Sequence, residues 1–240
     1  MKRRSGWQRD PEGMRKRILE AATAEFARHG YGGARIDRIA KAAGANKRML
    51  YYHVGKKDVL YLAILEGAYE HIRAAERCLN LEALAPGEAI AKLIAFTWQY
   101  YLDNPEFIAL LNNENLHRAR YLKRSGKVKQ LHSPFVELIA TVLRRGAASG
   151  ELRRGIDPVQ LYISIASLSY FYQSNSATLG VIFGRDLLAP AARAARLAHM
   201  TDLVLSALRP AAPAALDREV AKLIEFNQKV KTTGRPRTAG

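Results

Sequence analysis

The chain has 240 residues, 48% of them hydrophobic, and carries a formal charge of +16. This length is enough for a sizeable core in one or two domains, and frequent Ala and Leu without β-branched runs or Asn-Gly turns predict an all-α fold. A single cysteine, Cys78, excludes an intrachain disulfide, and the sequence shows neither a secretory leader nor a run of about 18 apolar residues, so we expect a cytoplasmic protein with no membrane partner.

The positive charge is concentrated at the two ends of the chain. Residues 1–60 carry a net charge of +9 and residues 227–240 a net charge of +4, whereas the long middle section carries only +3. Such a distribution favours a polyanionic partner for the N-terminal part. We interpret residues 1–12 as a flexible basic arm and residues 211–240 as a C-terminal extension that is disordered in part.

The first expected helix begins at Pro11, because proline suits the first helical turn. Ile18, Ala22 and Phe26 lie four residues apart and form its apolar stripe. The helix is expected to end at His29-Gly30.

Residues 36–53 show the pattern of two short helices separated by a glycine. The first helix has an apolar face that repeats at i, i+3, i+4 and i+7, formed by Ile36, Ile39, Ala40 and Ala43. Gly44 allows the left-handed turn that a side chain would resist, and Asn46 can cap the second helix. Because that second helix is rich in cationic and aromatic side chains, it suits the major groove of DNA.

The rest of the chain predicts a larger apolar helical bundle. A further amphipathic helix opens at Asp58 and links the two parts. Later helices are expected over 88–102, from Pro105 to Leu116, from Ser133-Pro134 to Gly146 or Gly150, from Asp157-Pro158 to about Ala177, and over Ala189–Leu208.

The order of these features resembles the TetR family of transcriptional regulators. The resemblance is carried by residues 15–65, RKRILEAATAEFARHGYGGARIDRIAKAAGANKRMLYYHVGKKDVLYLAIL. It implies a dimer whose C-terminal domains bind small ligands and thereby release DNA. It divides the chain into a three-helix, helix-turn-helix DNA-binding domain over 13–60 and a helical bundle for ligand binding and dimerisation over 61–210.

Seven residues are candidates for DNA contacts. Arg48, at the start of the second helix of the motif, is the candidate for reading a guanine. The resemblance implies phosphate contacts for Tyr51 and Lys57. The full set is Arg35, Lys47, Arg48, Tyr51, Tyr52, His53 and Lys57.

Alternative roles remain open for several of these residues. Tyr52 could pack against the first helix, and His53 could serve as a structural end-cap. Arg35 stands where the family usually has a Ser or Thr cap, so the cap is either weaker or supplied by another group. Val54 replaces the usual aromatic residue, which leaves the packing after the second motif helix open.

The C-terminal bundle holds candidates for a dimer interface and for an effector pocket. The resemblance places the dimer interface on the last two long helices, with Leu161, Ile165, Leu168, Leu197, Leu203 and Val204 as contributors, although the same residues fit a monomer core equally well. The candidates for the pocket combine aromatic and polar groups and are Trp98, Tyr101, Asn112, Asn115, Arg118, Tyr172 and Asn175. For any one of these pocket candidates, an exposed polar face or an ordinary aromatic core is an equally good interpretation. The mixture favours an aromatic acid whose carboxylate pairs with Arg118.

The sequence disfavours an enzyme. Its six histidines show no metal-ligand spacing, Cys78 lacks a nucleophile motif, and neither a nucleophile elbow nor a glycine-rich phosphate loop is present. We therefore expect no catalytic residue, cofactor or metal. The expected function is a repressor that binds a palindromic operator in double-stranded DNA as a homodimer and is released by a small molecule. The alternative is an architectural DNA-binding protein without an effector.

Overall fold

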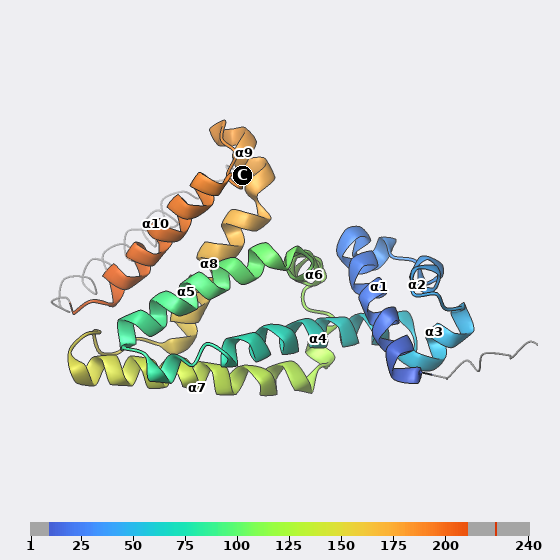
Figure 1. Ribbon diagram of the computed structural model, residues 1–240, viewed down its shortest axis with the longest axis horizontal. Helices are drawn as coiled ribbons and strands as arrows, with labels where there is room; N and C mark the ends of the chain where they lie inside the picture. The colour runs from blue at the N-terminus through green and yellow to red at the C-terminus, as the bar shows by residue number, and fades with distance from the viewer. Residues whose placement is uncertain (1–9, 211–223, 225–240) are drawn as a thin grey trace, which may run out of the picture.

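The computed structural model describes residues 10–210 and residue 224 (Figure 1). These residues form α-helices and two short 3-10 helices, with no strand among them, which confirms the predicted all-α fold. The α-helices are α1 (Pro11–Gly33), α2 (Ile36–Ala42), α3 (Lys47–Val54), α4 (Lys57–Arg77), α5 (Pro86–Asp103), α6 (Pro105–Leu116), α7 (Gly126–Ser149), α8 (Pro158–Ser174), α9 (Ser176–Phe183) and α10 (Pro190–Leu208). The 3-10 helices are Leu81–Ala83 and Leu122–Arg124. Over the described residues, no helix combines the length and hydropathy that a membrane span requires.

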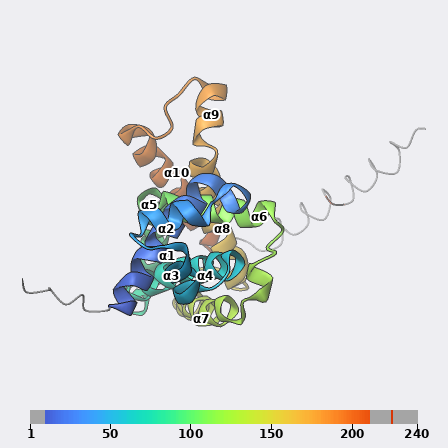
Figure 2. The same cartoon turned by 90° about the vertical axis from the view of Figure 1, so that its right-hand side faces the viewer.

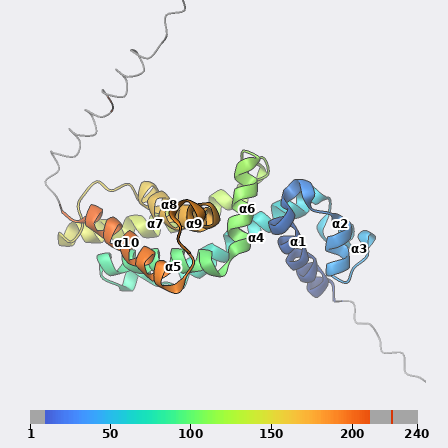
Figure 3. The same ribbon diagram turned by 90° about the horizontal axis from the view of Figure 1, so that it is seen from above.

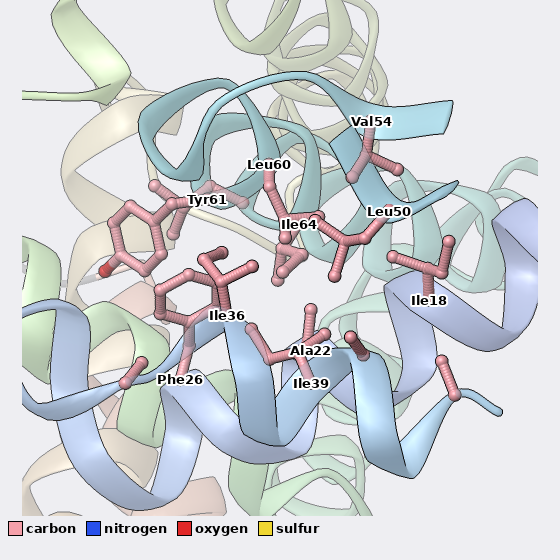
Figure 4. Close-up of a cluster of buried hydrophobic side chains, with 14 of the residues drawn as sticks. Ile18, Ala22, Phe26, Ile36, Ile39, Leu50, Val54, Leu60, Tyr61 and Ile64 are labelled. Atoms are coloured by element: carbon pink, nitrogen blue, oxygen red, sulfur yellow. The ribbon is translucent and has the colours of Figure 1, made fainter. Parts of the chain in front are cut away.

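The helices α1, α2 and α3 and the first half of α4 form a compact unit, which we call the head. Figure 4 shows its core, where Phe26 of α1, Ile39 of α2 and Leu50 of α3 point toward one another. All three side chains are fully buried. Burying a large apolar side chain contributes about 1.5–3 kcal/mol to the free energy of folding. The apolar faces predicted from the periodicity of these helices therefore stabilise the head by packing against one another.

The helix α4 runs from the head into the second unit, which we call the body and which comprises the second half of α4 and helices α5–α10 (Figures 1 and 3). Leu60, Tyr61 and Leu65 of α4 are buried in the head core. About two turns after Leu65, Ile72 and Arg73 are buried in the body. The predicted domain boundary at residue 60 therefore falls within a continuous helix.

The body core lies between α5, α7, α8 and α10. Trp98, Ile139, Ile165 and Met200 each come from a different one of these helices and are almost fully buried. The helix α7 packs along α4, and α5 packs on α8 and α10. The body is therefore a helical bundle of the kind predicted from the sequence.

The start of α7 differs from the prediction. The Ser133-Pro134 pair was expected to begin this helix, but α7 begins at Gly126 and Pro134 lies inside it. The Ser125 side chain caps the true start, because its Oγ accepts a hydrogen bond from the Val128 amide at 3.2 Å. A proline within a long packed helix removes one backbone hydrogen bond without ending the helix.

The end of α8 also differs from the prediction. The expected helix to about Ala177 is interrupted at Asn175, whose side chain donates to the Phe171 carbonyl at 3.0 Å. A separate helix, α9, follows and stands away from the rest of the body at the top of Figure 1. The C-terminal extension, except for Ile224, and most of the predicted N-terminal arm lie outside the described residues.

A side chain of α6 joins the body to the head. Asn113 Oδ1 accepts hydrogen bonds from the Tyr31 amide at 3.1 Å and from the Tyr61 hydroxyl at 3.0 Å. Gly30, with a φ of 63°, bends the end of α1 toward α6 and leaves room for the Asn113 amide. The contact fixes the end of α1 and the start of α4 on the same residue of the body.

Gly30→Ala is expected to lower the free energy of unfolding by about 1–3 kcal/mol. The added Cβ would lie 2.4 Å from Asn113 Nδ2, and alanine disfavours the positive φ. Gly32→Ala is the matched control, because nothing lies within 4 Å of its Cβ position. Urea denaturation measures both variants, and equal stability of the two would contradict this account of Gly30.

Candidate nucleic-acid interface

The turn between α2 and α3 has the geometry that the glycine pattern predicted. Gly44 has a φ of 65°, and the amide of Ala45 donates to the Ala40 carbonyl at 2.9 Å. Asn46 Oδ1 accepts a hydrogen bond from the Met49 amide at 2.8 Å, which caps α3. These local bonds fix the angle at which α3 leaves α2.

The helix α3 is anchored on one face and free on the other. Leu50 and Val54 are buried in the head core. Val54, which stands where the family usually has an aromatic residue, therefore does not leave this part of the core exposed to solvent. The opposite side presents Tyr51, which is 42% exposed, and Tyr52, which is 85% exposed. Tyr52 therefore does not pack against α1. Figure 2 shows the head helices from the end that carries α3.

The two cations at the start of α3 differ in their partners. Lys47 Nζ lies 3.1 Å from the Asp37 carboxylate of α2, and this hydrogen-bonded ion pair raises the pKa of Lys47. Arg48 is exposed and makes no ion pair or side-chain hydrogen bond with the part of the chain that is described. Arg48 is thus free to donate to an external partner.

Lys57, at the first position of α4, points inward rather than into solvent. Its Nζ donates to the Ala34 carbonyl at 2.6 Å and lies 4.8 Å from the centre of the Tyr31 ring. Burial lowers the pKa of Lys57. The side chain ties the loop between α1 and α2 to the start of α4, and its predicted phosphate contact stays a prediction.

The start of α2 is fixed by a carboxylate from α1. Arg35 makes no capping hydrogen bond with its side chain, and its amide donates to Glu25 Oε1 at 2.9 Å. The Arg38 guanidinium donates to the same oxygen at 2.7 Å. Burial opposes ionisation of Glu25, but these hydrogen bonds outweigh it and lower the pKa of Glu25. Glu25 therefore holds the start of α2 through the amide of Arg35, which is a different bond from the one that a Ser or Thr cap accepts from the amide two or three residues further on.

His53 has a structural contact through its backbone. The Arg15 guanidinium of α1 donates to the His53 carbonyl at 2.7 Å, and the imidazole lies edge-on to Tyr52 with the ring centres 5.2 Å apart. The bond from Arg15 holds the end of α3 against α1. A DNA contact by the imidazole stays a prediction.

The predicted effector residues fall into separate places in the body. Trp98 and Tyr172 meet with ring centres 5.5 Å apart. Tyr101 and Asn112 line a cavity of about 270 Å³ between α5, α6 and α8, where Asn112 also accepts a hydrogen bond from the Tyr170 hydroxyl.

The other three predicted effector residues do not join these pairs. Asn115 and Arg118 are exposed at the end of α6, and Asn175 caps the end of α8. The structure therefore does not bring all seven residues together in one place, because they lie on different helices and on different sides of α6.

Sequence reasoning missed several polar and charged side chains that face inward. Asn113 and Glu114, beside the chosen asparagines, face inward, and Glu114 accepts hydrogen bonds from the amides of Tyr121 and Leu122 at 2.8 and 2.9 Å. Arg73 and Glu76 are also buried. The sequence did contain a signal for Arg73 and Glu76. The apolar period of α4 runs through Leu65, Tyr69, Ile72 and Glu76, so it places a charged pair on the apolar stripe of this helix.

A helix-turn-helix head on a larger helical body defines a class of DNA-binding proteins with a C-terminal regulatory domain. Residues 18–64 match the family model described as bacterial regulatory proteins, tetR family, and residues 86–204 match the tetracyclin repressor-like C-terminal domain. The chain therefore belongs to the TetR family. It is a DNA-binding transcriptional regulator and not an enzyme.

Individual relatives agree with this assignment. The HTH-type transcriptional repressor NicS of Pseudomonas putida is 37% identical over 195 residues, which cover 81% of this chain and 92% of the relative. The regulator RutR of Escherichia coli K12 is 29% identical over 72% of this chain and 80% of its own. The structure of the fatty acid degradation regulator FadR from Bacillus halodurans matches with a TM-score of 0.61 and 16% sequence identity. The match covers 85% of this chain and 97% of that chain, and it shows that the two share a fold.

Glu25→Gln is expected to flatten the pH dependence of head stability. Because the pKa of Glu25 is lower in the folded state, the carboxylate stabilises the fold above the unfolded pKa of about 4.3, and this contribution is lost as the pH falls through the folded value. Urea denaturation at about pH 7 and about pH 3 measures the free energy of unfolding. The contribution of Glu25 is expected to be lost at the lower pH in the wild type and to be absent at both pH values in the variant. Glu20→Gln is the control, since Glu20 is 64% exposed and 3.9 Å from Lys16, and an equal effect in both variants would contradict the role of Glu25.

Proposed function

We propose that this chain is a cytoplasmic homodimeric repressor that binds a palindromic operator in double-stranded DNA and is released by a small-molecule effector. The observation that carries the proposal is α3, which buries Leu50 and Val54 and presents Arg48, Tyr51 and Tyr52 outward. A helix held in this way can enter a major groove with its first residues toward the bases. The name of the relative NicS, a transcriptional repressor, supports repression as the sign of regulation.

The proposed DNA contacts divide into base reading and phosphate binding. Arg48 is the proposed reader of a guanine edge, since its guanidinium has no competing partner among the described residues. Tyr51, Tyr52 and His53 are proposed to contact the sugar-phosphate backbone. The remaining phosphate contacts are assigned to Arg35, Lys47 and Lys57, and Lys47 would exchange its bond with Asp37 for a phosphate oxygen.

The proposed dimer interface is the outer face of α8 and α10. Leu161, Ile165 and Val204, which sequence alone could not assign, are buried within a single chain and belong to the monomer core. Ile163 and Leu203 are 49% and 48% exposed and line a shared groove of about 560 Å³. Covering these apolar side chains with the same face of a second copy would give the two-fold symmetry that a palindromic operator requires.

The proposed effector is a small aromatic acid bound in the body. The body is rich in buried aromatic side chains, and α4 connects it directly to the head. A ligand releases DNA only by binding one arrangement of head and body more tightly than the other. The Asn113 contact and the shared helix α4 are two of the connections through which such a preference would reach α3.

Arg48→Ala is expected to reduce discrimination between operator and random DNA by about 1–3 kcal/mol, because it removes a contact to a base edge.

Lys57→Ala is expected to weaken binding to both DNAs alike and to reduce the salt slope by about 1. Fluorescence anisotropy with the protein's own upstream DNA and a random duplex at several salt concentrations measures both effects. An unchanged affinity and salt slope in folded Lys57→Ala would contradict its phosphate contact, and unchanged discrimination in Arg48→Ala would contradict base reading.

Leu203→Glu is expected to dissociate the dimer, because it places a charge at the centre of the α8 and α10 face. Leu116→Glu is the control, since Leu116 is 79% exposed on α6, away from this face. Sedimentation velocity gives the mass of each variant. A dimeric Leu203→Glu protein, or a monomeric wild type, would contradict the proposed interface.

A further inference from the structure

The body buries a charged pair on α4. Arg73 and Glu76 are 2% and 0% exposed, and Arg73 Nε lies 2.9 Å from Glu76 Oε2. Arg73 Nη2 also donates to the Tyr162 hydroxyl at 2.6 Å. Among the described residues, Nε and Nη1 of Arg73 and both carboxylate oxygens of Glu76 have no well-aligned hydrogen bond.

The stability of the fold does not explain this pair. A guanidinium has five N–H donors, and buried charges without a full set of partners are costly. Apolar residues of similar volume often stabilise a core at least as well as a buried ion pair. Nη1 of Arg73, which has no partner among the described residues, points instead to an acceptor that comes from outside the chain.

Aromatic side chains surround the Arg73 guanidinium. Its central carbon lies 4.2 Å from the centre of the Phe135 ring and 5.1 Å from that of Tyr162. The His132 ring lies against Tyr162 and also against Tyr69, with centres 5.8 and 6.2 Å apart. These rings come from α4, α7 and α8 and offer flat apolar surfaces around a cation.

The other titratable groups near Arg73 favour their neutral forms. Burial, together with the charge of Arg73, lowers the pKa of His132 to about 4. Burial raises the pKa of Glu76 to about 8, even though Arg73 acts in the opposite direction. Arg73 is therefore the cation of this cluster, and Glu76 can become neutral when another anion approaches the guanidinium.

We propose that Arg73 binds the carboxylate of the effector, that the effector is a monocyclic aromatic acid, and that Glu76 competes with it for the same guanidinium. The inference rests on the proposed function, since it names the ligand contact of the regulatory body. It replaces Arg118 as the partner of the carboxylate, because Arg118 is exposed. An Arg–carboxylate pair can be bidentate, and the aromatic side chains would hold the planar ring.

A neighbouring cavity offers a route from this cluster to the head. The Phe107 ring lies 5.8 Å from both Tyr69 and Tyr101, and Phe107 also lines a cavity of about 270 Å³. Leu19 and Thr23 of α1 line the same cavity. Tyr69 contacts both Phe107 and His132, so aromatic rings connect the Arg73 cluster to this cavity, and a ligand bound at Arg73 would act on the first helix of the head through them.

The test uses the full-length protein with benzoate as the probe. Isothermal titration and thermal unfolding are expected to show binding and stabilisation by benzoate, and neither by the neutral isostere benzamide at the same concentration. Cyclohexanecarboxylate, which keeps the charge but lacks the planar ring, is expected to bind more weakly than benzoate.

Three variants separate a ligand contact from a structural role. Arg73→Met combined with Glu76→Leu is expected to keep the fold and to weaken benzoate binding at least about tenfold, because it replaces the buried pair with apolar groups. Arg144→Met combined with Glu137→Leu is the matched control, an Arg–Glu pair at 2.7 Å that is exposed on α7, and it is expected to bind as the wild type does. Glu76→Gln is expected to bind benzoate more tightly when the titration is done above pH 8, because the wild-type Glu76, whose pKa is raised to about 8, is then ionised and competes for the guanidinium.

The outcomes are decisive in both directions. Absence of benzoate binding to the wild type, wild-type affinity in the folded Arg73 and Glu76 double variant, or weaker binding by Glu76→Gln would overturn the proposal. If the double variant does not fold, the direction of the Glu76→Gln effect decides. Operator binding is measured on the same samples without benzoate, so that a protein that binds operator but not benzoate refutes the Arg73 site alone. Failure of the wild type to bind any operator DNA refutes the proposed function.

Discussion

The helix α4 is the constraint on which the rest of the structure depends, because it contributes buried side chains to two separate cores. Leu60 and Leu65 hold it in the head, and Ile72 holds it in the body. An α-helix rises 1.5 Å per residue and resists bending, so a shift at one end reaches the other. Asn113 of α6 adds a second connection close to the first. The head cannot change its position without disturbing contacts in the body.

This arrangement suits regulation better than it suits maximal stability. A ligand in the body can alter DNA binding only through a difference in its affinity for two arrangements of head and body. The body contains a buried charged pair whose hydrogen-bonding groups are only partly satisfied by the described residues, and a cavity that touches α1. A fully apolar core at the position of Arg73 would avoid the desolvation cost of a buried ion pair, but it would have no group that recognises a charged ligand.

The positive charge of the head serves the fold as well as DNA. Lys57, Arg15 and Arg38 donate to backbone carbonyl groups of the head, and Arg38 also binds Glu25. These bonds fix the loops and helix ends that carry α3. The net charge of the N-terminal region therefore overstates the number of cations available to phosphates, whereas Arg48 is available because no described residue engages its guanidinium.

The sequence by itself determined most of the helices, the turn at Gly44 and the cap at Asn46, because these depend on residues a few positions apart. It also identified the family through the order of features along the head. Tertiary structure decided which polar groups are buried, because the neighbours of a side chain such as Asn113 or Arg73 come from distant segments. For the same reason it separated monomer core from exposed face on α8 and α10 and scattered the predicted effector residues. Periodicity shows that a helix has an apolar face, but packing alone selects the partner of that face.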